Sequence, residues 1–327
     1  MMRLLVLSMF LMGNIASFAQ PNDASIYKAD SSAKAGNLIF ATQLYEKVFR
    51  AENGVFDKYD YYNAACVAAK ANNVDLAFTW LNKSLTLSFT DIKLLSSDDD
   101  LKSLHEDKRW DELLKEITRR KVDREAKYDK KVENELAKVY NEDQNIRKQY
   151  LTSLRQIPKD SLTTDSLGKV MMGVDSINQI AVSKVLKGYN SNQLLTLSDS
   201  SITTIFAVVQ HSNVLYQDKH FPFIKQAFKN GQIIKQLYVL LLDRMEMYKG
   251  NDQVYGTQII TTTAGYSFVS PVVDPVNLDK RRQAMGMPKM QSYLNRYNLK
   301  WNAQEHLSNK QQLKKLQLEV WQPVKDK

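Results

Sequence analysis

Residues 61–87, YYNAACVAAKANNVDLAFTWLNKSLTL, decide the fold class of the first half of this chain. Alanines crowd the first part of the stretch, Asn72-Asn73 supplies a turn, and Asp75 is a plausible cap for a second helix. The apolar side chains of that helix recur at three- and four-residue spacing, and they are Ala77, Phe78, Leu81 and Leu85. The stretch therefore predicts a helix, a short turn and a second helix, with small residues where the two helices approach closely.

The same pattern occurs once before, over residues 27–50, where Gly36-Asn37 supplies the break. The two units are about 34 residues apart, which is the length of a tetratricopeptide repeat, and the motif resembles that family. Residues 98–113 resemble the segment that closes such repeats. The side chains expected to cover the open end are Leu101, Leu104, Trp110 and Leu113. Residues 20–115 are thus predicted to form tetratricopeptide-like helical repeats, which serve either as a peptide-binding surface or as a docking module.

The first residues have the pattern of a secretory signal. Arg3 precedes an apolar run over 4–12, and residues 17–19 place small side chains at positions −3 and −1 of a cleavage site. The apolar run is too short to cross the roughly 30 Å hydrocarbon core of a bilayer. Residues 1–19 are therefore predicted to be a cleavable signal peptide. The mature chain is expected to be periplasmic or secreted and to have no transmembrane segment.

Charge and cysteine content exclude one class of partner and one kind of cross-link. The net charge is +9, and removal of Arg3 with the signal peptide lowers it to +8. The basic residues are scattered among almost as many acids and form no tract with interleaved aromatics, so no nucleic-acid partner is expected. Cys66 is the only cysteine, which excludes an intramolecular disulfide. Its alanine-rich surroundings predict a small buried residue of a helix.

The second half is predicted to be helical with one hairpin. Residues 116–157 are dense in charge with spaced apolar positions, which predicts a long, mostly solvated linking helix. Residues 158–327 are predicted to form a C-terminal helical domain. Within it, a run rich in β-branched residues, a turn at Ala264-Gly265 and a returning run predict a β-hairpin at about 253–273. The expected fold class is mainly α.

Two side chains stand out on the helices predicted in this domain. The helix predicted over 201–216 is apolar on two sides, which shelters His211. Arg244 lies at the edge of the apolar stripe of a helix predicted over 232–248. A guanidinium there needs an acidic or carbonyl partner, or it binds the carboxylate or phosphate of a ligand.

Four ordered motifs follow one another in this half: Gln210-His211, Asp243-Arg244, Gln253-x-Tyr255-Gly256-Thr257-Gln258 and Asp274-Pro275-x-x-Leu278-Asp279-x-Arg281-Arg282-x-x-x-Gly286. With Asp143-Gln144-x-x-Arg147 as leading motif, they resemble an uncharacterised bacterial domain family of unknown function over about residues 135–300. Tetratricopeptide-like repeats sometimes precede that family's domain. The resemblance indicates candidate residues but no reaction. One departure is the loop 189–192, Tyr-Asn-Ser-Asn, where a Gly-Trp-Pro-type loop is expected. If that loop shapes a site, the activity of this member is changed or lost.

The motifs supply the candidate site residues. The candidate catalytic residues are His211 and Asp243, because an imidazole titrates near pH 6.5 and serves acid–base catalysis. The candidate ligand-binding residues are Gln210, Arg244, Tyr255, Gln258, Arg281 and Arg282. His211 and His220 are nine residues apart across a predicted helix end and no cysteine supports them, so no metal site is expected. No cofactor is predicted. Neither a nucleophile motif nor a phosphate-binding glycine loop occurs, which leaves open whether the protein is an enzyme.

Three interpretations of these residues stay open. The first is an exported interaction or ligand-binding protein of the bacterial cell envelope, with an unknown envelope protein or a small anionic ligand as partner. The second is a hydrolase-like enzyme in which His211 is the general acid or base and an arginine clamps an anionic group. The third is a satisfied polar network that only fixes helix packing.

Overall fold

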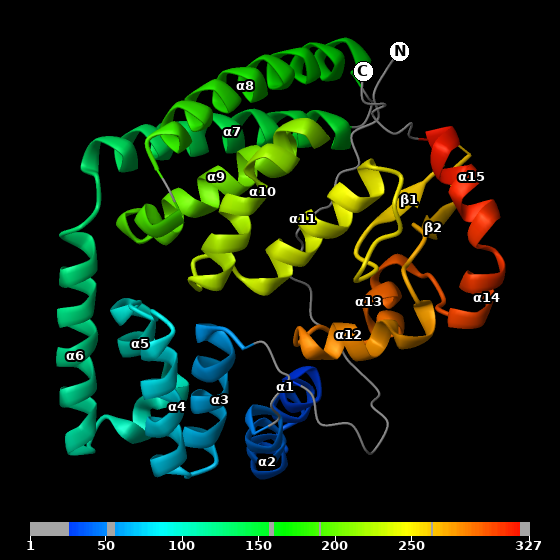
Figure 1. Cartoon of the computed structure of the whole chain (residues 1–327). Helices are drawn as coiled ribbons and strands as arrows, with labels where there is room; N and C mark the ends of the chain where they lie inside the picture. Colours follow the sequence, from blue (N-terminus) through cyan, green and yellow to red (C-terminus); the bar gives the residue numbers. More distant parts are fainter. Residues whose placement is uncertain (1–25, 51–55, 157–159, 190, 263, 321–327) are drawn as a thin grey trace. The chain divides into compact units, whose positions relative to one another are not determined.

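The computed structural model describes residues 26–50, 56–156, 160–189, 191–262 and 264–320 (Figure 1). The predicted signal peptide at 1–19 lies outside these residues, as does Asn190 of the departing loop.

The described residues are mainly helical with one antiparallel β-hairpin, which confirms the predicted fold class. The α-helices are α1 (Ile26–Lys34), α2 (Leu38–Phe49), α3 (Lys58–Lys70), α4 (Val74–Thr86), α5 (Ile92–Ser97), α6 (Lys108–Glu125), α7 (Lys130–Arg155), α8 (Ser161–Lys187), α9 (Asp199–His211), α10 (Val214–Lys229), α11 (Lys235–Tyr248), α12 (Leu278–Ala284), α13 (Met290–Leu294), α14 (Ala303–Ser308) and α15 (Lys310–Val320). The strands are β1 (Ile259–Thr261) and β2 (Ser267–Val269). Short 3-10 helices are η1 (Asp99–Leu104), η2 (Ser191–Thr196), η3 (Pro275–Asn277) and η4 (Asn295–Tyr297).

The chain divides into two compact units. The central unit is Lys115–Tyr238, and the terminal unit combines Met1–Leu114 with Val239–Lys327. Among the described residues, no helix combines the length and the hydropathy that crossing a bilayer requires.

The helices of the predicted repeats pack in sequence, α1 on α2, α2 on α3 and α3 on α4. Asp57 begins α3 with a capping box, because its carboxylate accepts from the backbone N–H of Asp60 while the Asp60 side chain accepts from that of Asp57. The cap of α4 is Asn73, which accepts from the N–H of Leu76, so the expectation that Asp75 caps this helix is wrong. Asp75 instead lies in the first turn and binds Arg109.

Small and apolar residues bury the repeat interfaces. Fully buried alanines of α3 and α4 allow close helix approach, and they are Ala64, Ala65, Ala68, Ala69 and Ala77. The predicted closing side chains, Leu101, Leu104, Trp110 and Leu113, are all buried, and η1 packs on α3.

The segment 116–157 differs from the predicted single linking helix. It contains the end of α6, a break at 126–129, and α7. Asp129 causes the new start, because its carboxylate accepts from the N–H groups of Lys131 and Val132 and so caps α7. The apolar positions of α7 pack on α8 and α9, so this helix belongs to the core of the central unit.

The hairpin is shorter than the predicted span 253–273. Its ladder pairs Ile259 with Val269 and Thr261 with Ser267. Before β1, the side chain of Gln253 lies between the two segments. Its amide donates to the carbonyls of Gln258 (3.1 Å) and Ser270 (2.6 Å) and accepts from the Gln258 N–H (2.8 Å). A side chain therefore takes hydrogen bonds that would otherwise extend the ladder.

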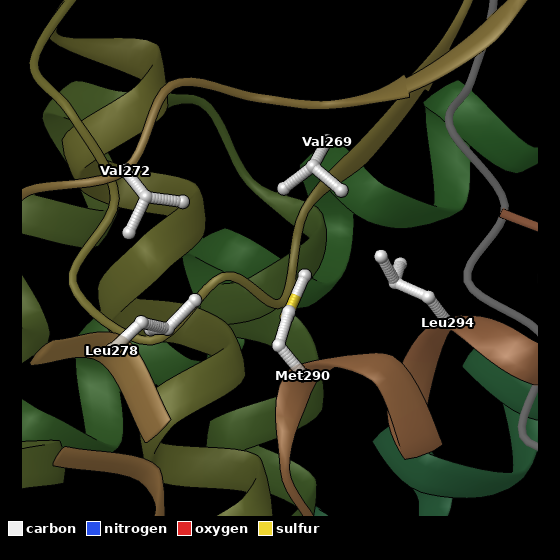
Figure 2. Packing of buried hydrophobic residues seen from close by; sticks show 5 residues of the cluster. All are labelled: Val269, Val272, Leu278, Met290 and Leu294. Atoms are coloured by element: carbon white, nitrogen blue, oxygen red, sulfur yellow. The ribbon is translucent and has the colours of Figure 1, made fainter. Parts of the chain in front are cut away.

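Behind the hairpin, a buried apolar cluster joins β2 to α12 and α13 (Figure 2). Its members are Val269, Val272, Leu278, Met290 and Leu294. Figure 2 shows Met290 extending from α13 towards Val269. This cluster packs closely against the loop between α11 and β1, because a Cβ on Gly256 would lie 3.0 Å from the sulfur of Met290.

Candidate functional site

Three helices of the central unit bring a polar network together. Asp143 lies on α7, Asp175 on α8, and His211 is the last residue of α9, and these helices lie side by side (Figure 1). Nδ1 of His211 lies 3.4 Å from a carboxylate oxygen of Asp143. Arg147, one turn after Asp143 on α7, contacts both aspartates. The network therefore contains an imidazole, two carboxylates and one guanidinium.

Arg147 organises the two carboxylates. Its Nη2 and Nε donate to Asp143 at 3.1 and 3.2 Å, and Nη2 also donates to Asp175. The side-chain amide of Gln144 donates to the second Asp143 oxygen at 2.8 Å. Only 1% of Asp143 is exposed, so this carboxylate needs every one of these donors.

The surroundings set the charges of the network. Burial alone would raise the pKa of Asp143, but hydrogen bonds and charge from His211 and Arg147 outweigh it and lower that pKa to about 2. Burial raises the pKa of Asp175, against the charge of Arg147. Burial also lowers the pKa of His211, although the hydrogen bond to Asp143 opposes that change. The imidazole is therefore neutral at pH 7, the state in which it accepts a proton.

The end of α9 places His211. A continuous helix is expected over 201–216, but the chain breaks after His211, where Ser212 is extended and Asn213 caps α10 by accepting from the Tyr216 N–H. The side chain of Gln217 donates to the carbonyls of Gln210 and Ser212, which satisfies the end of α9. The His211 side chain stays 21% exposed while its partner Asp143 is buried. This geometry holds Nδ1 inward and leaves Nε2 as the ring nitrogen that Asp143 does not engage.

Three side chains of this network are of the types that bind metal ions. Asp143, Asp175 and His211 each offer one ligand atom, and these atoms lie within 4.8 Å of one another. Arg147, however, already donates to both carboxylates, so a cation would bind next to a guanidinium charge. The described residues therefore fit an acid–base or ligand-binding network better than a metal centre.

Asp243 lies in the terminal unit and binds a loop of its own chain. One carboxylate oxygen accepts from the N–H groups of Val254 (2.7 Å) and Tyr255 (2.8 Å). The other accepts from the N–H (2.8 Å) and the hydroxyl (2.9 Å) of Thr257. Asp243 is fully buried, and its two oxygens each accept two hydrogen bonds.

The predicted arginines of this unit bind backbone carbonyls. Arg281 donates to the carbonyls of Val254 (3.1 Å), Asp274 (3.1 Å) and Val273. Arg282 is buried and donates to those of Pro288 (2.7 Å) and Tyr255 (2.6 Å).

The other predicted residues of the terminal unit are also engaged. The Gln258 amide donates to the carbonyl of Leu240 at 3.2 Å. Arg244 is buried, and Tyr255 binds Asp243 and Arg282 through its backbone. These contacts assemble the segment between α11 and α13.

The candidate residues therefore separate into two groups. His211 and Gln210 lie in the central unit, and the other six lie in the terminal unit. The residues that surround His211 are Asp143, Arg147 and Asp175. The spacing of Asp143 and Arg147 by one helical turn was a sequence signal for an ion pair. Asp175 carried no such signal, since it meets Arg147 only when α8 packs on α7.

A family model described as a family of unknown function, DUF6624, matches residues 130–302, which is more than half of the chain. The chain belongs to the DUF6624 family. The expected extent of the resemblance, about 135–300, lies within this match. No curated protein and no solved structure matches the chain.

The DUF6624 match contains both networks. It begins at the first residue of α7, includes the Asp143–His211 network, and ends after the segment that Asp243 and the two arginines assemble. The predicted repeats precede the match. The DUF6624 domain therefore carries its own candidate site, at the junction of α7, α8 and α9.

Proposed function

We propose that this is an exported ligand-binding protein of the bacterial cell envelope, and that its DUF6624 domain binds the ligand where His211 is exposed. The observation that carries the proposal is the part-exposed imidazole held at Nδ1 by a buried carboxylate. A neutral imidazole in this position offers Nε2 as a donor or an acceptor to a ligand. Export rests on the pattern of residues 1–19 and is part of the same proposal.

A ligand screen compares two histidine variants. Wild type, His211→Asn and the control His105→Asn are screened by thermal shift against a library of small metabolites and cell-wall fragments. His105 lies beside Trp110 in the first half of the chain, away from the DUF6624 match. At least one compound is expected to stabilise wild type and His105→Asn but not His211→Asn. Hits that stabilise all three proteins equally would remove His211 from the site.

Export has a separate test. The full-length chain is expressed in a bacterium, the cells are fractionated, and the N-terminus of the recovered protein is read by mass spectrometry. We expect a chain that begins at Gln20 outside the cytoplasm. A chain that keeps residues 1–19 in the cytoplasmic fraction would contradict the localisation and leave the ligand site untouched.

A second candidate function is hydrolase-like catalysis with His211 as general base. The contact between Nδ1 and Asp143 favours it, because a carboxylate at one ring nitrogen orients the imidazole and stabilises its protonated form. The arginine clamp of this hypothesis gains no support from the contacts, since Arg147 pairs with two aspartates and Arg281 binds carbonyls.

The catalytic hypothesis is tested with chromogenic ester, amide and phosphoester substrates. If His211 is the base, His211→Gln is expected to lower kcat by about a hundredfold or more, while His105→Gln keeps wild-type kcat. Equal turnover by His211→Gln and wild type would exclude the imidazole from the reaction.

A further inference from the structure

A pocket of about 310 Å³ lies between α8 and α10, and the Asp143–His211 network does not line it. Ser183 lines the pocket and lies about 12 Å along α8 from Asp175, at 1.5 Å per residue, so the pocket is separate from that network. The apolar side of the pocket is formed by Leu186, Pro222 and Phe223. Its polar side chains include Lys187, Lys219 and His220.

His220 is the unusual residue of this pocket. It is only 8% exposed, and its Nε2 is buried with no hydrogen-bond partner among the described residues. Burial, and then the charge of Lys219, lower the pKa of His220, so the imidazole is neutral at pH 7. A buried polar atom without a partner is uncommon in folded proteins, and a bound water, ion or ligand would satisfy it.

The wall beside His220 is rigidly built. The Tyr216 ring lies 4.4 Å from the imidazole. Its hydroxyl donates to the Gln179 carbonyl (2.9 Å) and accepts from the Ser183 hydroxyl (3.1 Å). These bonds tie α10 to α8 beside the pocket, and the Tyr216 ring packs against the imidazole.

The charge of the pocket points to an anion. Lys187 and Lys219 are exposed and line the pocket from two different helices. Within the part of the chain that the structure describes, neither lysine forms an ion pair with a carboxylate, so both charges act on the pocket. Of the described side chains that line the pocket, none is acidic.

We propose that this pocket binds a small organic anion with an apolar body. The anionic group accepts a hydrogen bond from Nε2 of His220 and is attracted by the two lysines. The apolar body packs on Leu186, Pro222 and Phe223. The site stands on residues that the proposed function does not use.

The test compares a charged probe with its neutral isostere. Binding of benzoate and of benzamide to the mature protein is measured at pH 7.5 by ligand-observed NMR. Benzoate is expected to bind at least about tenfold more tightly than benzamide, because only benzoate carries the charge. Equal affinities, or no detectable binding of benzoate and of a second probe, hexanoate, would overturn the proposal.

Variants of the side chains that line the pocket locate the site, and the two exposed lysines can be changed without disturbing the core. Lys187→Gln combined with Lys219→Gln is expected to weaken benzoate binding about tenfold, and His220→Ala to weaken it as well. Lys184→Gln is the matched control, since Lys184 is an exposed lysine of the same helix that does not line the pocket. His211→Asn should leave benzoate binding unchanged, which separates this proposal from the proposed function. Unchanged binding by the double lysine variant would place benzoate elsewhere and refute the site.

Discussion

Asp143 of the central unit and Asp243 of the terminal unit are both buried carboxylates, yet they are bound by different kinds of group. Asp243 accepts from three backbone N–H groups and one hydroxyl, all from the loop that follows its own helix. Asp143 is bound by side chains from two helices, and one of these, His211, reaches solvent. A carboxylate saturated by backbone fixes a loop, whereas we propose that a carboxylate that holds a part-exposed imidazole prepares that imidazole for a ligand.

The largest expected effect is that of Asp243→Asn. In the wild type, both carboxylate oxygens accept hydrogen bonds. The substitution replaces one of these oxygens with an NH₂ group, which cannot accept, so buried N–H groups lose their partners. We expect the free energy of unfolding to fall by about 4 kcal/mol, at the upper end for one polar substitution. Urea unfolding measures it, with Asp111→Asn on the exposed face of α6 as control. A loss as small as that of the control would show that Asp243 does not hold the loop.

Removal of Arg147 from the Asp143–His211 network should lower the free energy of unfolding slightly less than Asp243→Asn does. Arg147→Met leaves Asp143 and Asp175 facing each other without a cation, which we expect to lower the free energy of unfolding by about 3 kcal/mol. Adding Asp175→Asn should restore part of this loss, because it removes one of the two unpaired charges. The control is Arg119→Met, whose exposed partners Glu116 and Asp123 predict a change of at most about 1 kcal/mol. If the double variant is no more stable than Arg147→Met, charge repulsion does not explain the loss.

His306 gives the terminal unit a pH dependence of the same sign as that expected for His211. Its Nε2 accepts from the N–H of Val272 (3.2 Å), and burial lowers its pKa to about 4. Since the unfolded chain takes up a proton near pH 6.5, stability is complete above that pH and is lost as the pH falls towards 4. The loss from this group is expected to be about 2 kcal/mol at pH 5.

Unfolding at pH 7.5 and pH 5 tests this assignment. In His306→Gln, the difference in the free energy of unfolding between pH 7.5 and pH 5 should shrink by about 2 kcal/mol. The pH dependence that is left should include contributions from His211 and His220, whose pKa values burial also lowers. An unchanged difference would mean that His306 is not the group that titrates.

Elements built from local spacing were predictable from the sequence. The alanines of 61–87 and the apolar stripes gave the helical pairs, and the β-branched run before Gly265 gave the hairpin. These features follow from helix and strand periodicity, which acts within a few residues. The fold class was therefore within reach.

The partners of the candidate residues were not predictable in the same way. Asp175 joins the His211 network only through the packing of α8 on α7, which no spacing encodes. The donors to Asp243 are backbone N–H groups, which every residue other than proline possesses, so side-chain identity does not reveal them. The break at Ser212 depends on Asn213 capping a new helix, a local competition that the continuous apolar pattern hides.

The smallest expected effect tests how tightly the Asp243 loop is held. Gly256 and Gly265 both have positive φ, +70° and +83°, so alanine strains the backbone at each by about 1 kcal/mol. They differ in space, because a Cβ at Gly256 would lie 3.0 Å from the Met290 sulfur and 3.3 Å from Leu278, while nothing lies within 4 Å at Gly265. Gly256→Ala should therefore lower the free energy of unfolding by about 1 kcal/mol more than Gly265→Ala, the added term being overpacking against the cluster in Figure 2. In a Met290→Ala background, the cost of Gly256→Ala should fall to that of Gly265→Ala, since Met290→Ala vacates the space that the new Cβ enters. Equal losses from the two glycine variants would show that the loop yields to accommodate the methyl group, and that Asp243 holds it less firmly than its four hydrogen bonds imply.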